Sequence, residues 1–437
     1  MEENVNKGRW LALLPIVVFL VVYIGVSVIF NDFYLMSVVV AFMIAVLVAC
    51  FQNRGLSFND KIKVMAKGVA DENIITMILI FLAAGVFAGI LGREGAQAVA
   101  DLFLKVVPAK FSPLVLFIVA CFISTSMGTS CGTIAVIAPI ALQLSTATGV
   151  SCALCTASVV GGAMFGDNLS FISDTTIAAT STQGCKMKDK FKENFIIALP
   201  AAILTIVILL IFAFTNDATN TYTPGEINIW FIVPYVLVLV GGIVGINVFI
   251  VLIVGVVSAI IVKLCLSAPV ISIISSMGAG ASGMYEVIIV TLLVSMLSAL
   301  MREYGGFDAL LYGIKKVFKG NVGGQLGVGL LVSAMDVATA NNTVAIVMAA
   351  PIAKNISQEY NITNTKTASL LDIFGSVVQG IIPYGAQMMT AVALTGVSAI
   401  SIIPYVFYPY LLAISAVVFM FIPSKKNKTP DKIVSEE

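Results

Sequence analysis

The chain has 437 residues, of which 59% are hydrophobic and 11% charged, and its mean hydropathy is +1.05. Because about a quarter of the residues in a soluble domain are charged, this composition excludes a water-soluble fold and predicts an all-α, polytopic membrane protein in a lipid bilayer. The net charge of +1 gives no reason to expect a nucleic-acid partner, and the absence of histidine excludes a His-ligated metal site.

The apolar sequence falls into two similar series of runs, and each run is long enough to cross a bilayer, which takes about 20 residues. Lys7 and Arg9 precede the first run, which is too long for the core of a signal peptide. Each series begins with two apolar runs and ends with one, at residues 10–30, 35–51 and 194–214 and at residues 229–245, 246–263 and 401–421. We expect each run to form a transmembrane helix.

Short motifs recur at an almost constant distance along the chain, which indicates an internal repeat. Arg93-Glu94 recurs as Arg302-Glu303, and GTSCGTIAVIAPIA (128–141) resembles ATANNTVAIVMAAPIA (338–353). The two Arg-Glu pairs are interpreted as ion pairs at helix ends in loops. The predicted division of the chain is a first repeat at 1–214, an external linker at 215–228 and a second repeat at 229–437.

The distribution of lysine and arginine predicts opposite orientations of the two repeats in the membrane. Basic loops follow the second apolar run and precede the last run of the first series, whereas the matching segments of the second series lack such charge. These loops carry Arg54, Lys61, Lys63, Lys67, Lys186, Lys188, Lys190 and Lys192. We expect them, and both termini, to face the cytoplasm from a bacterial inner membrane. Inverted repeats with broken helices are typical of secondary transporters.

Four polar segments interrupt the apolar sequence where such a transporter breaks its helices. They are ISTSMGTSCGT (123–133), FGDNLSFISDTT (165–176), SAMDVATANNT (333–343) and FGSVVQGIIPYGAQ (374–387). Irregular backbone at membrane depth is tolerated only where it lines a cavity or is buried in protein. We therefore expect broken helices or re-entrant hairpins around a binding site near the middle of the membrane.

Asp167 and Asp174, in the second of these segments, are the main candidates for binding ions. A carboxylate within the bilayer costs several kcal/mol unless it is paired, and no lysine or arginine lies within this segment. A hard cation takes oxygen ligands, whereas burial without a cation favours the protonated acid. One aspartate can therefore hold a sodium ion or a proton but not both, which is the chemistry that exchange of the two ions requires.

The remaining polar residues of these segments are further candidates. The predicted cation and proton ligands are Asp167, Asp174, Asn168, Ser170, Ser173, Thr175 and Asp336, with a sodium ion at Asp167 and Asp174. The predicted substrate ligands are Thr129, Thr133, Asn341, Asn342, Thr343 and Gln379. The alternative interpretation is structural, because Asp and Asn also cap helices and hydroxyls often bond to their own helix. Asp372 fits a site and a packed core equally well. We expect no cofactor besides the transported Na⁺ and H⁺.

With these residues the chain resembles the NhaC-type sodium/proton antiporter family. The motifs that carry the resemblance are GTSCGTIAVIAPIA, GGAMFGDNLSFISDTTIAAT followed by KMKDKFKEN, and FGSVVQGIIPYGAQ. The most specific pattern contains Gly166, Asp167, Ser170, Ser173, Asp174, Thr175 and Thr176. The resemblance implies the fold of the ion transporter superfamily, with a scaffold part and a mobile transport part of the elevator kind, often in a homodimer.

Other functions fit some of these features. A Na⁺- or H⁺-coupled transporter of an amino acid or another organic solute would use the same aspartates for the driving ion, with Asn341, Asn342 and Gln379 at the solute. An intramembrane aspartyl protease would need glycine at Met164 to complete its G-x-G-D pattern. Carboxylates also suit a channel. Because paired broken helices favour alternating access, we expect a secondary active Na⁺/H⁺ antiporter and not an enzyme.

Overall fold

The computed structural model describes residues 8–30, 36–215, 227–244 and 246–422, and every regular element within these ranges is helical. Most of the predicted linker and the basic C-terminal tail lie outside the described residues. The first half contains η1 (Trp10–Leu13), α1 (Leu14–Phe30), α2 (Val38–Phe51), α3 (Phe58–Val69), α4 (Glu72–Val106), η2 (Ala109–Phe111), α5 (Ser112–Met127), α6 (Ser130–Thr148), α7 (Cys152–Leu169), α8 (Asp174–Gln183) and α9 (Met187–Thr215).

The second half contains a further series of helices. They are η3 (Ile229–Phe231), α10 (Ile232–Ile243), α11 (Val248–Cys265), α12 (Val270–Gly283), α13 (Tyr285–Glu303), α14 (Gly306–Val317), α15 (Gly320–Thr339), α16 (Asn342–Glu359), α17 (Asn364–Gln379), α18 (Ala386–Thr395), α19 (Ala399–Ile402), η4 (Ile403–Tyr405) and α20 (Phe407–Met420). Of the predicted apolar runs, those at 194–214 and 246–263 correspond to α9 and α11, which are long and apolar enough to cross a membrane. The runs at 10–30, 35–51 and 229–245 contain shorter helices among the described residues, and the run at 401–421 is divided at Val406 between η4 and α20.

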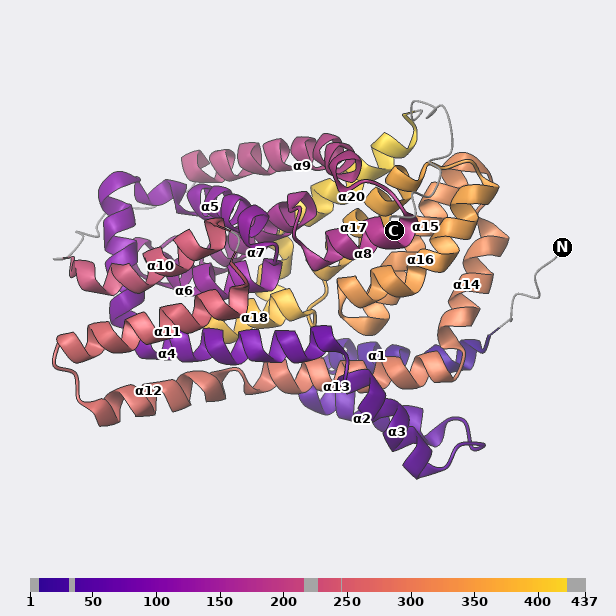
Figure 1. Ribbon diagram of the computed structural model, residues 1–437, viewed down its shortest axis with the longest axis horizontal. Helices are drawn as coiled ribbons and strands as arrows, with labels where there is room; N and C mark the ends of the chain where they lie inside the picture. The colour runs from indigo at the N-terminus through magenta and orange to yellow at the C-terminus, as the bar shows by residue number, and fades with distance from the viewer. Residues whose placement is uncertain (1–7, 31–35, 216–226, 245, 423–437) are drawn as a thin grey trace, which may run out of the picture.

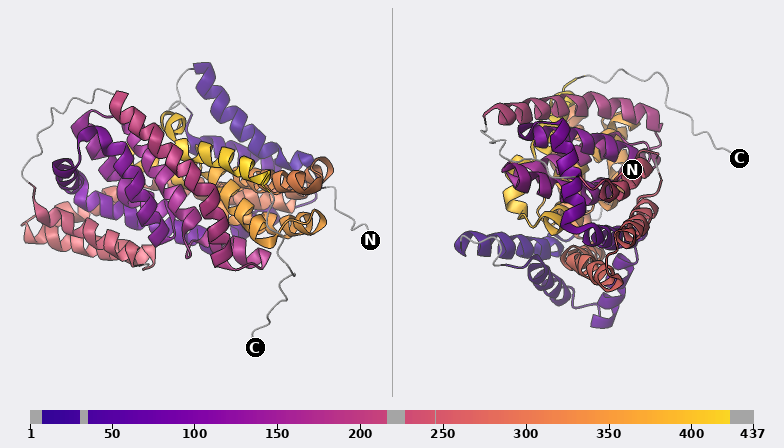
Figure 2. Two further views of the ribbon diagram at one scale, coloured as in Figure 1. Left: turned by 90° about the horizontal axis from the view of Figure 1, so that it is seen from above. Right: turned by 90° about the vertical axis from the view of Figure 1, so that its left-hand side faces the viewer.

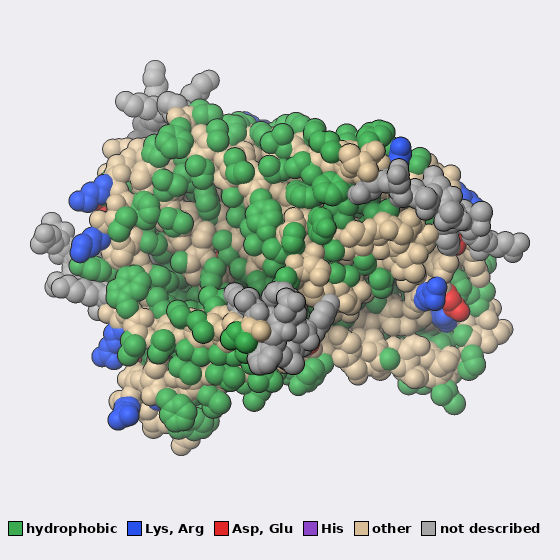
Figure 3. All heavy atoms as spheres, turned by 180° about the vertical axis from the view of Figure 1, so that it is seen from behind, with side chains coloured by type: hydrophobic (Ala, Val, Ile, Leu, Met, Phe, Trp, Pro, Cys, Tyr) green, Lys and Arg blue, Asp and Glu red, His purple; other side chains and the backbone are tan. Residues whose placement is uncertain are grey.

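The surface of the molecule is that of a polytopic membrane protein. Among the described residues, seven helices are long and apolar enough to cross a membrane, or up to eight if the bent pair Ala386–Thr395 and Ala399–Tyr405 is one span. Figure 3 shows lysine and arginine side chains gathered toward the two ends of the long axis, with a broad apolar face between them. This pattern fits a bilayer that crosses the middle of the long axis.

The helices form a bundle with a layer on one side. Helices α1–α3, α12 and α13 lie on one side of the bundle that contains α5–α9 and α15–α20 (Figures 1 and 2). The long helix α4 connects the two parts, because it packs against α11 and α12 and also against α6. Helix α13 packs against α2 and α3. The polar cavity described below lies where α4 meets the bundle.

Small residues allow close helix packing between α5 and α7. A Cβ atom added at Gly162 would lie 2.3 Å from the carbonyl oxygen of Phe117, and one at Gly166 would lie 2.5 Å from the carbonyl oxygen of Cys121. Only glycine therefore lets the two backbones approach this closely, as small residues do in membrane helix pairs. This contact fixes the end of α7, where Asp167 lies.

The structure corrects the interpretation of the first Arg-Glu pair and places the second at a helix end, as predicted. Arg93 and Glu94 lie inside α4, just after Gly92, whose φ of 54° marks a kink in that helix. The carboxylate of Glu94 accepts a hydrogen bond from Lys263 Nζ at 2.6 Å, so its ion-pair partner belongs to α11. Arg302 and Glu303 end α13 and line a cavity that is described below.

Candidate functional site

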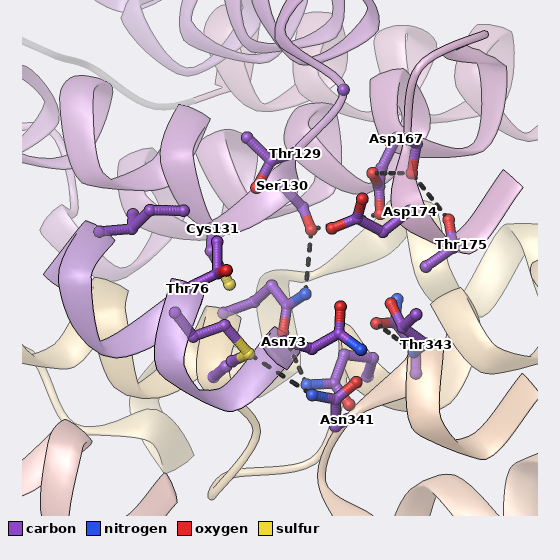
Figure 4. A pocket seen from close by; sticks show the side chains of 18 residues that line it. Asn73, Thr76, Thr129, Ser130, Cys131, Asp167, Asp174, Thr175, Asn341 and Thr343 are labelled. Atoms are coloured by element: carbon purple, nitrogen blue, oxygen red, sulfur yellow. Dashed lines mark hydrogen bonds between the residues drawn. The ribbon is translucent and has the colours of Figure 1, made fainter. Parts of the chain in front are cut away.

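Four helices begin at one cavity of about 70 Å³, whose lining is shown in Figure 4. These are α6, α8, α16 and α18, each of which follows a break in the chain. Gly128 and Ala340, at the first and third breaks, have φ values of 68° and 48°, and Thr129 and Asn341 then cap the helices that follow. The first turn of α4 completes the wall with Asn73, Thr76 and Met77. Free amides of a helix start point past its end, so all four breaks present polar backbone to the cavity.

Asp167 lines this cavity close to the end of α7, and its side chain is 3% exposed. Its carboxylate accepts a hydrogen bond from Ser173 Oγ at 2.7 Å and a longer one from Ser130 Oγ at 3.4 Å. Ser173 Oγ also lies 2.8 Å from Thr175 Oγ1. Asp167 therefore has hydroxyl partners and makes no ion pair with a described residue.

Asp174 is the first residue of α8, and it lines the same cavity with an exposed side chain. Figure 4 shows Asp167 and Asp174 near Ser130 and Thr175, with Asn341 across the cavity. The unwinding between α7 and α8 thus brings two acids to one cavity that an intact helix would place about 10 Å apart along its axis.

The second half of the chain supplies the opposite wall. Asn341 Oδ1 caps α16 by accepting a hydrogen bond from Val344 N at 3.1 Å. Gln379 Nε2 donates to Gln387 Oε1 at 2.7 Å, and Gln387 Nε2 donates to Ser130 Oγ at 2.9 Å. This chain of amides crosses from α17 through α18 to α6, so it links the two halves at the site.

Several predicted ligands line the cavity and others do not. The lining includes Asp167, Ser173, Asp174, Thr175, Thr129, Asn341, Asn342, Thr343 and Gln379. Thr133 donates to the carbonyl of Thr129 in its own helix, and Ser170 Oγ accepts a hydrogen bond from Ile172 N. Asp336 is fully buried behind the cavity wall, and both of its carboxylate oxygens lack a hydrogen-bond partner.

Asn168 lies outside the cavity, and its side chain links the end of α7 to the second half of the chain by hydrogen bonds. Its Nδ2 donates to the Tyr408 hydroxyl at 3.2 Å, and its Oδ1 accepts from Ser376 Oγ at 2.5 Å. Its carbonyl oxygen, freed where α7 stops, accepts from Asn194 Nδ2 at 2.8 Å and from Lys190 Nζ at 3.3 Å. The break is thus held by side chains of α9.

A buried ion pair beside this break is the main feature that sequence analysis missed. Lys190 Nζ lies 2.6 Å from Asp372 Oδ2 and donates to Thr176 Oγ1 at 2.7 Å. The prediction that Lys190 faces the cytoplasm is wrong for its side chain, which is 1% exposed. Asp372 belongs to the packed core at this pair. The only signal in the sequence was that both residues lie near breaks, and spacing alone does not pair them.

Other lining residues were also missed, namely Asn73, Thr76, Met77, Ile80, Cys131, Ala386 and Gln387. Ser130 and Gln387 lie within quoted motifs, but nothing in the pattern distinguishes their side chains from those of neighbours. Among the described residues, no group of three or more His, Cys, Asp or Glu side chains could hold a metal ion. A cation at this cavity would therefore take most of its ligands from hydroxyl, amide and backbone oxygens, as sodium and other hard cations can.

A larger cavity of about 300 Å³, here called the vestibule, approaches the site between α3, α13 and the break before α16. Lys67, Asp71, Arg302 and Glu303 contribute charged side chains to its wall. A smaller space of about 10 Å³ lies between the vestibule and the site cavity, and Asn341 borders all three. Asn341 Nδ2 contacts Met77 Sδ at 3.4 Å, which closes the wall at this point.

A family model and two curated relatives that cover most of the chain all describe Na⁺/H⁺ antiporters. The model described as the Na⁺/H⁺ antiporter family matches residues 5–214 and 219–423. The Na⁺/H⁺ antiporter NhaC of Bacillus subtilis (strain 168) is 22% identical over 398 residues, which cover 82% of this chain and 87% of that protein. NhaC of Alkalihalophilus pseudofirmus is 20% identical over 353 residues, covering 73% of this chain and 76% of that one.

Similarities to part of the chain and to solved structures were also found. The malate-2H⁺/Na⁺-lactate antiporter of Bacillus subtilis is 23% identical over 202 residues, which cover 43% of this chain and 42% of that protein. Among solved structures, the YdaH transporter of Alcanivorax borkumensis has a TM-score of 0.40 and 14% identity, with 78% of this chain and 84% of that chain covered. Neisseria gonorrhoeae MtrF has a TM-score of 0.40 and 11% identity, with 94% and 96% covered.

Proposed function

This chain belongs to the Na⁺/H⁺ antiporter family, and we propose that its ion exchange takes place in the site cavity at Asp167 and Asp174. As a member of that family it is a secondary active transporter of the membrane and not an enzyme. The observation that carries the proposal is the environment of Asp167. Its carboxylate is almost fully buried at a polar cavity and accepts hydrogen bonds only from hydroxyl groups.

The exchange follows from what a carboxylate in such a place can bind. A sodium ion at the Asp167 carboxylate stabilises the ionised acid, and its remaining ligands are oxygens such as those of Ser173 and Thr175. When sodium leaves, a proton neutralises the acid at lower cost than leaving the charge buried. The two ions thus compete for one group, and Asp174, at the more open side of the cavity, is the first acid that an entering ion meets.

We further propose that the two halves are inverted repeats. The support is the packing of the helix that follows the second break in each half. Helix α8, from the first half, packs against α16 and α17, and α18, from the second half, packs against α6 and α7. In Figure 1, α5–α7 and α15–α17 lie toward opposite ends of the long axis. In this arrangement the bundle around the cavity moves as the transport part against a scaffold formed by α1–α4 and α10–α13.

The basic residues give the proposed orientation. The end of the molecule that carries Arg54, Lys63 and Lys67 faces the cytoplasm of a bacterial inner membrane, by the positive-inside rule. Both termini are placed on that side by the same rule. A homodimer stays a prediction.

The test uses purified protein in vesicles that hold a pH-sensitive dye. An imposed sodium gradient should drive proton movement in the opposite direction in the wild-type protein, and Asp167→Asn should abolish it because the amide can neither carry a proton nor neutralise sodium. Asp174→Asn should slow the flux by tenfold or more, about the effect of one lost charge-assisted contact.

The matched control is Asp189→Asn, which removes an exposed carboxylate from the first turn of α9. This variant should exchange ions at the wild-type rate. Normal exchange by the Asp167→Asn and Asp174→Asn variants would show that the ions bind elsewhere.

A further inference from the structure

Asp336 is a buried acid that the proposed exchange does not use. It lies in the last turn of α15, before the third break, and its side chain is 0% exposed. Neither of its carboxylate oxygens has a hydrogen-bond partner among the described residues. Asp372 is equally buried, but Lys190 and Asn194 donate hydrogen bonds to its carboxylate. An ionised Asp336 would therefore be a buried charge without compensation, which is costly.

No charged side chain described on the helices that pack against α15 is within hydrogen-bond distance of the Asp336 carboxylate. These helices are α13, α14, α16, α17 and α20. The ionisable side chain beside Asp336 is that of Tyr384, whose hydroxyl donates to the carbonyl oxygen of Val337 at 2.7 Å. The charged side chains described on those helices form other ion pairs, line the vestibule or are at least partly exposed, and they are Lys366 and Asp372, Arg302 and Glu303, and Glu286, Asp308, Lys316, Lys354 and Glu359.

Gln379 lies next to Asp336 and belongs to the wall of the site cavity. Its Nε2 donates to the carbonyl oxygen of Ala340 at 3.0 Å and to Gln387 Oε1 at 2.7 Å. Ala340 N in turn donates to the carbonyl oxygen of Asp336 at 2.7 Å. Gln379 Oε1 is buried without a hydrogen-bond partner. Because buried polar atoms are nearly always paired in native proteins, Asp336 and Gln379 together present acceptors that lack a donor.

A proton on Asp336 supplies such a donor and also removes the buried charge. A sodium ion fits less well, because it needs several oxygen ligands and room for itself. Asp336 borders neither the site cavity, nor the vestibule, nor the small space between them. The packing around this acid therefore favours a proton over a metal ion.

A chain of hydrogen bonds joins Gln379 to the acid of the proposed exchange. Gln387 Nε2 donates to Ser130 Oγ at 2.9 Å, and Ser130 Oγ donates to Asp167 Oδ2 at 3.4 Å. Each amide of the chain offers a donor on one side and an acceptor on the other. If one member turns, the next must turn as well to keep a donor opposite each acceptor.

We propose that Asp336 is a second proton site, protonated in this conformation, and that sodium binding at Asp167 releases its proton through the chain of Ser130, Gln387 and Gln379. The inference rests on the proposed exchange at Asp167 and adds to it an acid that responds to the bound ion from outside the cavity. By linkage, the proton on Asp336 must weaken sodium binding as much as sodium weakens the binding of that proton.

The coupling follows from the direction of each hydrogen bond. With sodium at Asp167, Ser130 Oγ directs its lone pairs to the ion and its hydrogen to Gln387. Gln387 then presents Nε2 to Gln379, and Gln379 presents Nε2 to Asp336. The resulting hydrogen bond to an ionised carboxylate is charge-assisted, so it offsets the lost bond between Gln379 and a neutral carbonyl.

The released proton has an exit on the side of the vestibule. Ala340 and Tyr384 border the space of about 10 Å³ between the vestibule and the site cavity. This space has about the volume that one water molecule needs. A water there accepts the proton of Asp336 and passes it to the vestibule.

The test is the infrared difference spectrum of the purified protein on addition of sodium chloride, with choline chloride as the salt control. A protonated carboxylic acid has a carbonyl band that its ionised form lacks. In the wild type, sodium should remove a band that is absent from Asp336→Asn, which has the shape and neutral charge of the protonated acid. The matched control, Asp189→Asn, changes an exposed acid of α9 and should give the wild-type spectrum.

Gln387→Met keeps Asp336 and interrupts the chain. Its spectrum is recorded at sodium concentrations that saturate the variant, as judged from the shift of its thermal unfolding. The Asp336 band should then remain after sodium is added. Identical sodium-induced spectra of the wild type and Asp336→Asn would overturn the proton site, and loss of the band in Gln387→Met would overturn the chain.

Proton flux in vesicles separates this inference from the proposed exchange. Sodium-driven flux that Asp167→Asn abolishes, without any sodium-dependent band at Asp336, leaves the exchange intact and overturns the second proton site. Sodium-driven flux that persists in Asp167→Asn contradicts the exchange instead.

Discussion

Lys190 and Asp372 form a charge pair whose side chains are 1% and 0% exposed, and Lys190 contacts Asn168 and Thr176, which lie close in the chain to the acids of the proposed ion site. The pair does not line the site cavity. Its lysine instead donates to the carbonyl of Asn168 and the hydroxyl of Thr176, on either side of the break. At the scale of single residues, the pair therefore fixes the geometry that presents Asp167 and Asp174.

Removing one partner of this pair should lower the free energy of unfolding more than removing both partners does. Lys190→Met or Asp372→Asn alone should destabilise the protein by about 3–5 kcal/mol, because a buried charge is left without compensation. The double variant should recover part of that loss. The measurement is the unfolding free energy in detergent for the wild type, both single variants and the double variant.

The Lys263–Glu94 pair is the matched control for this cycle. Its distance is also 2.6 Å, but its side chains are 19% and 66% exposed. Breaking it should cost less than about 1 kcal/mol, as is usual for exposed pairs. Equal effects at the two pairs would contradict the role given to burial.

At the scale of helices, the contact between α5 and α7 depends on glycine. Gly162→Ala would place a methyl carbon 2.3 Å from the carbonyl oxygen of Phe117, so the helices must separate. We expect a loss of about 1–3 kcal/mol of stability, typical of overpacking, together with slower ion exchange because Asp167 lies at the end of α7. Thermal unfolding and vesicle flux measure the two effects.

The control for this variant is Gly278→Ala in α12. No atom lies within 4 Å of the added carbon there, so only helix propensity changes. This variant should be unchanged or more stable by about 0.5–1 kcal/mol. A similar loss at both positions would mean that glycine acts through chain flexibility and not through the α5–α7 contact.

The helices and their breaks could be predicted from the sequence because both follow from local patterns. Apolar runs of sufficient length specify membrane helices, and clusters of Gly, Ser, Thr, Asn and Asp marked all four breaks. Asp167 and Asp174 stood out because ionisable residues are rare in such sequence. Lys190 was misplaced because its neighbours form a basic loop, and only the three-dimensional approach of α9 to α17 reveals its partner. The contribution of α4 to the cavity has no local signal either.

At the scale of the whole molecule, the vestibule approaches the site on the side of α3 and α13. It lies between helices of the proposed scaffold and the break before α16, which belongs to the proposed transport part. Asn341 and Met77 close the wall between the vestibule and the site. Movement of α16 relative to α4 would open this wall, because the two residues belong to those two helices.

If ions pass through the vestibule, a group attached inside it should stop transport. Ser298 lines the vestibule on α13, so Ser298→Cys should allow a membrane-impermeant thiosulfonate to attach there, in a protein whose seven native cysteines are replaced by alanine. The attached group fills a space of about 300 Å³, and sodium-driven proton flux should fall to the level of protein-free vesicles. Asn59→Cys, exposed on α3 outside the vestibule, should react without losing flux. Full flux through protein modified at position 298 would place the ion path elsewhere.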